Sequence, residues 1–168
     1  MLIRMISAIS KWDGSKDIDR KNAYICGDAV SDLRTTDNKL SVWKADTKED
    51  IDDAIVALAL NRDSVSKLSY LVLDEKDLDE MDIEISDKEA GVAAGLDSKI
   101  LTKHRDLIDL DYWQLGFLAE YMTTLAQDES NQHFCSVSEI KKLLGRYKDE
   151  CKIVPEQVKD KLKEKLKW

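Results

Sequence analysis

Two aspartates follow two of the most apolar runs of the sequence, where paired carboxylates could hold a metal ion. Asp46 follows Leu40–Ala45, and Asp74 follows Leu68–Leu73. The carboxyl ends of parallel strands share one edge of a sheet, where two carboxylates could bind Mg²⁺ and support hydrolysis or phosphoryl transfer. The competing interpretation is structural, because acids commonly end strands and negative charge stabilises a helix start beside Asp46. We favour the structural interpretation and keep a metal-dependent hydrolase or phosphotransferase as the alternative.

The histidines and cysteines do not form a recognisable catalytic or zinc-binding pattern. Cys26 follows a short apolar run and could be a nucleophile at a helix start, but nothing in the sequence brings His104 or His133 to it. His133, Cys135 and Cys151 offer three soft ligands without a fourth, which argues against structural zinc. His104 lacks a second convergent group and is not predicted to be a general base. We therefore predict no catalytic residue, no cofactor and no metal outside the alternative above, and we lean against an enzyme.

The composition indicates a globular protein with one main domain. The sequence has 168 residues, 43% of them hydrophobic, with six Gly and one Pro, so it can bury a core and has few linkers. Its three cysteines are an odd number and widely spaced, which argues against a disulfide framework. The first ten residues do not resemble a secretion signal, and no apolar run approaches the roughly twenty residues of a membrane helix. We expect a cytoplasmic protein without membrane association.

The charge is distributed unevenly along the chain. The net charge is −8, of which residues 1–135 carry −12 and residues 136–168 carry +4. An acidic body repels phosphate backbones, which argues against nucleic acid as a ligand of the core and favours a basic protein partner. The charge also divides the chain into an acidic domain, 1–135, and a basic helical extension, 136–168, that we expect to pack on it.

The densest charge lies between Asp74 and Glu89, where nine acids accompany two lysines. The segment fails as an EF-hand because Met81 stands at a ligand position and no Gly occupies the sharp turn. One interpretation is an edge strand at Asp82–Ile85 whose acids prevent edge-to-edge aggregation. The other is a binding face for a basic protein, where opposed charges speed association. The candidate partner-binding residues are Asp77, Asp79, Glu80, Asp82 and Glu84, with Trp12 as a possible aromatic anchor. For Trp12 we favour the alternative, a lid on the edge of the core, because Trp is highly buried on average.

The central part of the chain reads strand, helix, strand. Two short runs rich in β-formers, Leu40–Asp46 and Leu68–Asp74, flank a helix predicted to begin at about Lys48, with Thr47 as its N-cap. About twenty linking residues can lay a helix across the sheet between parallel strands, as a right-handed βαβ unit. On this helix we expect Asp52, Asp53 and Arg62 to point to water.

Two further helical regions complete the expected architecture. Residues 109–127 are apolar almost all round, which predicts a buried helix whose aromatic stripe, Trp113, Phe117 and Tyr121, packs on the sheet. Ser136 begins a helix through an S-x-x-E capping box, and a final helix follows Pro155. The fold class we predict is α/β, with α+β as the other possibility: a small mixed sheet of about four strands with a βαβ unit, one buried cover helix and a two-helix C-terminal extension.

Three functional hypotheses follow. The first is a non-enzymatic acidic module that binds a basic partner protein, such as an immunity protein, antitoxin or accessory subunit in a bacterial conflict system. The second is the metal-dependent hydrolase or phosphotransferase that would use Asp46 and Asp74. The third is a structural module that oligomerises through its C-terminal helices. The sequence leaves the oligomeric state open.

Overall fold

The computed structural model describes residues 1–12, 27–86 and 95–168 and contains one six-stranded sheet. The strand order is β4-β5-β2-β1-β3-β6, and every neighbouring pair is antiparallel. The strands are β1 (Leu2–Ile6), β2 (Leu40–Lys44), β3 (Leu68–Leu73), β4 (Glu84–Ile85), β5 (His104–Ile108) and β6 (His133–Cys135). The α/β fold class is confirmed. The sheet is larger than the four or so strands expected, and it is antiparallel where a mixed sheet was predicted.

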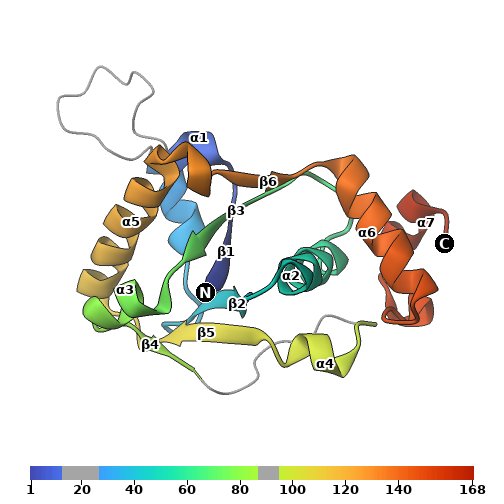
Figure 1. The fold of residues 1–168 in the computed structure, drawn as a ribbon, viewed down its shortest axis with the longest axis horizontal. Helices are drawn as coiled ribbons and strands as arrows, with labels where there is room; N and C mark the ends of the chain where they lie inside the picture. Colours follow the sequence, from blue (N-terminus) through green and yellow to red (C-terminus); the bar gives the residue numbers. More distant parts are fainter. Residues whose placement is uncertain (13–26, 87–94) are drawn as a thin grey trace.

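Helices cover both faces of this sheet (Figure 1). The α-helices are α1 (Ile9–Trp12), α2 (Lys48–Leu60), α3 (Glu75–Glu80), α4 (Ser98–Leu101), α5 (Tyr112–Gln127), α6 (Val137–Asp149) and α7 (Asp160–Leu166). The described ranges also contain three 3-10 helices, η1 (Gly27–Leu33), η2 (Glu129–Asn131) and η3 (Pro155–Gln157). None of the helices in the described ranges is long and apolar enough to cross a membrane.

The strand-helix-strand unit is present, with a third strand inserted into it. β2 and β3 run in the same direction because each pairs antiparallel with β1, which lies between them. Ile3 stands opposite both Trp43 and Val72. β1 takes this central place because alternate residues bury apolar side chains on both faces: Ile3 packs in the core beneath α2, and Leu2 and Ile6 pack in the core beneath α5.

α2 begins where the sequence predicted, but two of its acids are buried. The Thr47 side chain accepts a hydrogen bond from Asp50 N, and the Asp50 carboxylate accepts one in return from Thr47 N. Asp52 and Asp53, which were expected to face water, are only 6% and 3% exposed, so that expectation was wrong. Both carboxylates are buried because cations and a hydroxyl from elsewhere in the chain neutralise and hydrogen-bond them.

The C-terminal helices pack on α2. The Ser136 capping box is present, and α6 buries Ile140, Leu144 and Tyr147 in the same apolar cluster that contains α2. α7 adds Leu162 to this cluster. The Tyr147 hydroxyl donates to Asp53 Oδ1 at 2.6 Å, and an Arg146 guanidinium N–H donates to Asp52 Oδ2 at 2.9 Å. The apolar faces of α6 and α7 are therefore used within the chain.

α5 is not buried all round, which corrects the prediction for residues 109–127. Its buried side chains are Leu118, Met122, Thr123 and Ala126. Trp113 and Phe117, by contrast, are 70% and 51% exposed. The helix lies at the outside of the fold and covers one face of the sheet, so only one side of it has anything to pack against (Figure 1).

Candidate partner-binding surface

The acidic segment is anchored by two apolar side chains and leaves its carboxylates outside. Asp74 is the N-cap of α3 and accepts a hydrogen bond from Lys76 N at 2.8 Å. Leu78 and Ile83 are buried in the core beneath α5. The chain then continues into β4, the edge strand expected near this position. The carboxylates of Asp79, Glu80, Asp82 and Glu84 are exposed as a consequence.

Side-chain hydrogen bonds hold α5 beside this acidic segment. The Tyr121 hydroxyl donates to Asp77 Oδ2 at 2.6 Å and accepts from Asp74 N at 3.0 Å. Burial and the hydrogen bond to Asp77 raise the pKa of Tyr121, so the hydroxyl stays protonated. At the start of α5, Gln114 Nε2 donates to the Asp82 carbonyl oxygen at 2.5 Å. The hydrogen bonds of Tyr121 and Gln114 therefore fix the position of α5 relative to α3 and β4.

Three aromatic side chains stand exposed on the first half of α5. Tyr112 is 83% exposed, and its ring lies edge-on to that of Trp113 with the centroids 5.8 Å apart. Phe117 follows Trp113 by one helical turn. The Asp111–Gln114 capping box fixes the start of the helix that carries these rings. Such large apolar groups gathered in solvent mark interaction sites more often than single exposed residues do.

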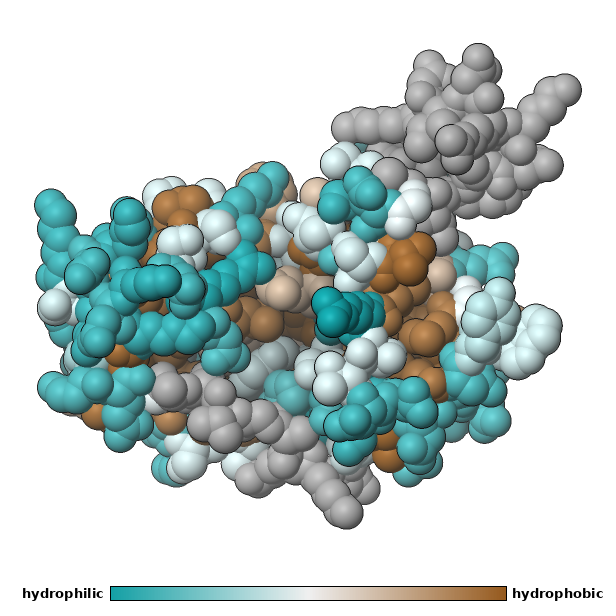
Figure 2. All heavy atoms as spheres, turned by 180° about the vertical axis from the view of Figure 1, so that it is seen from behind, coloured by the Kyte–Doolittle hydropathy of each residue, from teal (hydrophilic) through white to brown (hydrophobic). Residues whose placement is uncertain are grey.

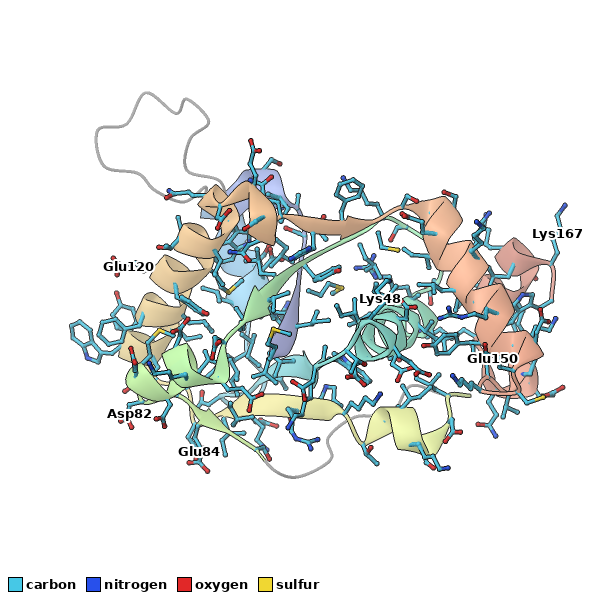
Figure 3. All side chains as sticks on the ribbon, in the orientation of Figure 1. Lys48, Asp82, Glu84, Glu120, Glu150 and Lys167 are labelled. Carbon is cyan, nitrogen blue, oxygen red and sulfur yellow. The ribbon has the colours of Figure 1, made fainter. Side chains whose placement is uncertain are left out.

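The carboxylates and rings together form a surface with a hollow in it. We name this the acidic–aromatic surface; it consists of Asp79, Glu80, Asp82, Glu84, Tyr112, Trp113 and Phe117. The hollow has a volume of about 390 Å³ and is lined by Asp79, Asp82, Ile83, Glu84, Ile108, Asp109 and Gln114. Four carboxylates line it, so a lysine or arginine side chain of a partner would be attracted into it. In Figure 3, Asp82 and Glu84 lie near α3 and β4, with α5 rising beside them and Glu120 on its outer side.

Apolar groups are also visible on the reverse side of the molecule. Seen from behind, hydrophobic side chains reach the surface in the centre and toward the α5 end, while the α6 and α7 end is mostly hydrophilic (Figure 2). This distribution agrees with an exposed apolar region at the α5 end.

Trp12 does not belong to this surface. Its side chain is 0% exposed and lies in the core beneath α5, and its Nε1 donates to Asp32 Oδ2 at 2.9 Å. Asp32 also accepts from Ser7 N at 2.9 Å and so links the end of β1 to η1. The indole is thus a packing group, which corrects its interpretation as an exposed anchor and agrees with the high average burial of Trp.

The two aspartates of the metal hypothesis lie at the same edge of the sheet and are engaged with the chain itself. Asp46 Oδ1 and Glu75 Oε1 accept from the Met1 ammonium at 2.9 and 3.0 Å. Asp74 caps α3 as described above. Within the described ranges, no group of three or more His, Cys, Asp or Glu is arranged to hold a metal ion. The catalytic use of Asp46 and Asp74 stays a prediction.

The remaining candidates do not converge. Cys26 lies outside the described residues. His104 is buried edge-on to Trp43, with ring centroids 5.1 Å apart, and burial lowers its pKa. Cys135 is buried, and burial raises its pKa to about 11, so it is a poor nucleophile. Cys151 is exposed.

No family model matches the sequence, and searches of curated proteins and of solved structures gave no significant match. The functional argument therefore depends on this chain's own surface. The exposed rings of α5 were missed by the sequence reasoning, because an apolar pattern does not show which side of a helix lacks a neighbour.

Proposed function

We propose that this protein is a non-enzymatic binding module that takes a basic partner protein on the acidic–aromatic surface. The observation that carries the proposal is the placement of three exposed rings beside four exposed carboxylates, on elements tied together by Tyr121 and Gln114. An immunity protein, an antitoxin or an accessory subunit that neutralises a basic protein in a bacterial conflict system would use such a surface. We expect the protein to act in the cytoplasm.

The two kinds of side chain would have separate roles in binding. Aromatic side chains dominate the energy of many interfaces because they bury large apolar areas with few rotatable bonds. Trp113 and Tyr112 can also lie against lysine or arginine side chains, whose charge is attracted to the face of an aromatic ring. The carboxylates around them would speed encounter with a basic surface and disfavour acidic proteins. Asp77 would act indirectly, by holding Tyr121 and hence α5 in place.

Charge also argues against a symmetric pairing of two copies through this face. In such a dimer the carboxylates of Asp79, Asp82 and Glu84 would face the same groups of the second copy. Like charges brought together at an interface cost binding energy. A basic partner avoids this repulsion and neutralises the hollow.

The experiment that tests the proposal compares two charge-reversed variants of equal net charge. The first carries Asp79→Lys, Glu80→Lys and Glu84→Lys. The second, a matched control at the opposite end of the molecule, reverses three exposed acids, Asp149, Glu156 and Glu164. Asp82 is left unchanged in both, because its φ of 56° is a left-handed conformation that Asp tolerates better than Lys.

Each variant is immobilised and used to capture proteins from lysate of the native cell, and the affinity of any captured basic protein is then measured with purified components. We expect the first variant and a separate Trp113→Ala variant each to lose the same basic partner, with affinity reduced at least 30-fold for the tryptophan change. The matched control should keep it. Retention of that partner by both test variants, or equal loss by the control, would refute the proposal.

A further inference from the structure

A second hollow lies far from the acidic–aromatic surface, between α2, α6, β3 and β6. Its volume of about 490 Å³ falls in the range of roughly 300–1,000 Å³ found for small-molecule sites. The lining residues are Lys48, Asp52, Ile55, Tyr70, Phe134, Cys135, Glu139, Lys142, Leu143 and Arg146. In Figure 3, Lys48 lies on α2, of which it is the first residue, whereas Asp82 and Glu84 lie at the α3 and β4 end.

A buried carboxylate holds two cations at this hollow. Asp52 Oδ1 accepts from Lys48 Nζ at 2.8 Å, and its Oδ2 accepts from an Arg146 guanidinium N–H at 2.9 Å. Each oxygen of this buried carboxylate accepts a hydrogen bond from a cation, so its negative charge is neutralised by Lys48 and Arg146. The hydrogen bond from Arg146 to Asp52 raises the pKa of Arg146, which keeps the guanidinium charged.

The third cation of the hollow, Lys142, is held less closely by carboxylates than Lys48 and Arg146 are. Glu139 is committed to the start of α6, where its Oε2 accepts from Ser136 N at 2.8 Å and from Ser136 Oγ at 2.6 Å. Those hydrogen bonds lower the pKa of Glu139. Lys142 makes no ion pair with a carboxylate within the described part of the chain, although its charge contributes to the lowered pKa of Glu139. Among the lining side chains, three cations face two carboxylates, which leaves the lining with one excess positive charge; Glu150, outside the lining, also lies 3.9 Å from Arg146 Nε.

The rest of the lining is apolar or aromatic. Ile55 and Leu143 come from α2 and α6, and Tyr70 is stacked on His133 with ring centroids 5.1 Å apart. Phe134 is 61% exposed although it lies at the hollow, so a bound group could remove much of its ring from water. The raised pKa of Cys135 keeps its thiol neutral, and it adds no negative charge at neutral pH.

We propose that this hollow binds a small amphipathic anion: a flat apolar group that carries one negatively charged head group such as a carboxylate. The flat group would contact Phe134, Tyr70 and Leu143, and the head group would lie near Lys142. Preformed apolar walls with a few placed charges are the usual composition of small-molecule sites. The inference is independent of the proposed protein-binding function, since the two sites share no residue.

The test uses 2-naphthoate, its uncharged analogue 2-naphthalenemethanol and inorganic phosphate, each titrated into the full-length protein by calorimetry. We expect 2-naphthoate to bind about tenfold more tightly than the alcohol, because only the carboxylate can use the excess positive charge. Inorganic phosphate alone should show no saturable binding, because it lacks the apolar group. Equal affinity for naphthoate and the alcohol, saturable binding of inorganic phosphate, or no naphthoate binding would overturn the proposal.

Two neighbouring lysines of α6 provide a matched pair of variants. Lys142 lines the hollow and Lys141 does not, and both are exposed, so neither change should unfold the protein. Lys142→Glu should weaken naphthoate binding at least fivefold, while Lys141→Glu, with the same change in net charge, should alter it less than twofold. Trp113→Ala should leave it unchanged. Equal effects of the two lysine changes, or loss of binding in the tryptophan variant, would show that naphthoate binds elsewhere.

Discussion

Removing one hydroxyl from α6 should measurably weaken the whole fold. The Tyr147 hydroxyl donates to Asp53 Oδ1 at 2.6 Å, and both side chains are buried. The other carboxylate oxygen, Oδ2, accepts from Lys103 Nζ at 2.6 Å, so each oxygen has one strong partner. Tyr147→Phe keeps the ring and leaves Asp53 Oδ1 without its donor.

The expected magnitude follows from the charge on the acceptor. A hydrogen bond to a charged group contributes about 1.5–3 kcal/mol to stability. No water can replace the Tyr147 hydroxyl at the buried carboxylate, so the variant should lose this whole contribution. For a chain of this size, about 2 kcal/mol corresponds to a fall in melting temperature of roughly 4–8 °C. Because α6 shares its core with α2, we expect one cooperative unfolding transition, without a separate earlier transition of the C-terminal helices.

Urea denaturation, followed by circular dichroism and by tryptophan fluorescence, measures this free energy of unfolding. Tyr112→Phe is the matched control, because that side chain is almost fully exposed and its change should alter stability by less than about 0.5 kcal/mol. If the two tyrosine variants unfold at the same urea concentration, the hydrogen bond from Tyr147 to Asp53 does not stabilise the fold. Two separated transitions would instead show that residues 136–168 unfold independently.

Three other predictions concern single side chains. Hydrogen bonds from Lys103 and from Thr47 lower the pKa of Asp50 to about 2 despite the opposing effect of burial. The Asp50 carboxylate therefore stabilises the fold above pH 4, and this contribution is lost as the pH falls toward 2. The difference in unfolding free energy between the wild type and Asp50→Asn should shrink over that interval. Burial lowers the pKa of His104, so stability should fall as pH drops below 6.5, and His104→Phe should flatten that part of the stability profile. With a thiol reagent on the native protein, Cys151→Ser should remove one fast-reacting thiol and Cys135→Ser none.

The helix starts could be predicted from local sequence. Thr47 with Asp50 and Ser136 with Glu139 are neighbours in sequence, so their reciprocal hydrogen bonds form wherever the helix forms. Local patterns of the same kind located β2, β3 and the edge strand near Glu84.

The buried acids and exposed rings could not be predicted in this way. Asp53 is buried because Tyr147, 94 residues further along the chain, brings it a donor, and no local pattern reports such a partner. Trp113 is exposed because α5 lies at the outside of the fold with nothing beyond it. Residue type alone favoured an exposed Asp53 and a buried Trp113. The candidate binding surface depends on the exposure of Trp113.

The insertion of β1 between β2 and β3 affects how the chain can fold during synthesis. β1 precedes both of its partners in the chain: it can pair with β2 only after Lys44 has been made, and its pairing with β3 must wait until Leu73. An apolar strand without partners can pair wrongly or aggregate during that time. Contacts between such distant residues also make folding slow. Until Lys44 has been made, the central strand is therefore an apolar segment of the nascent chain that a molecular chaperone would protect from wrong pairing.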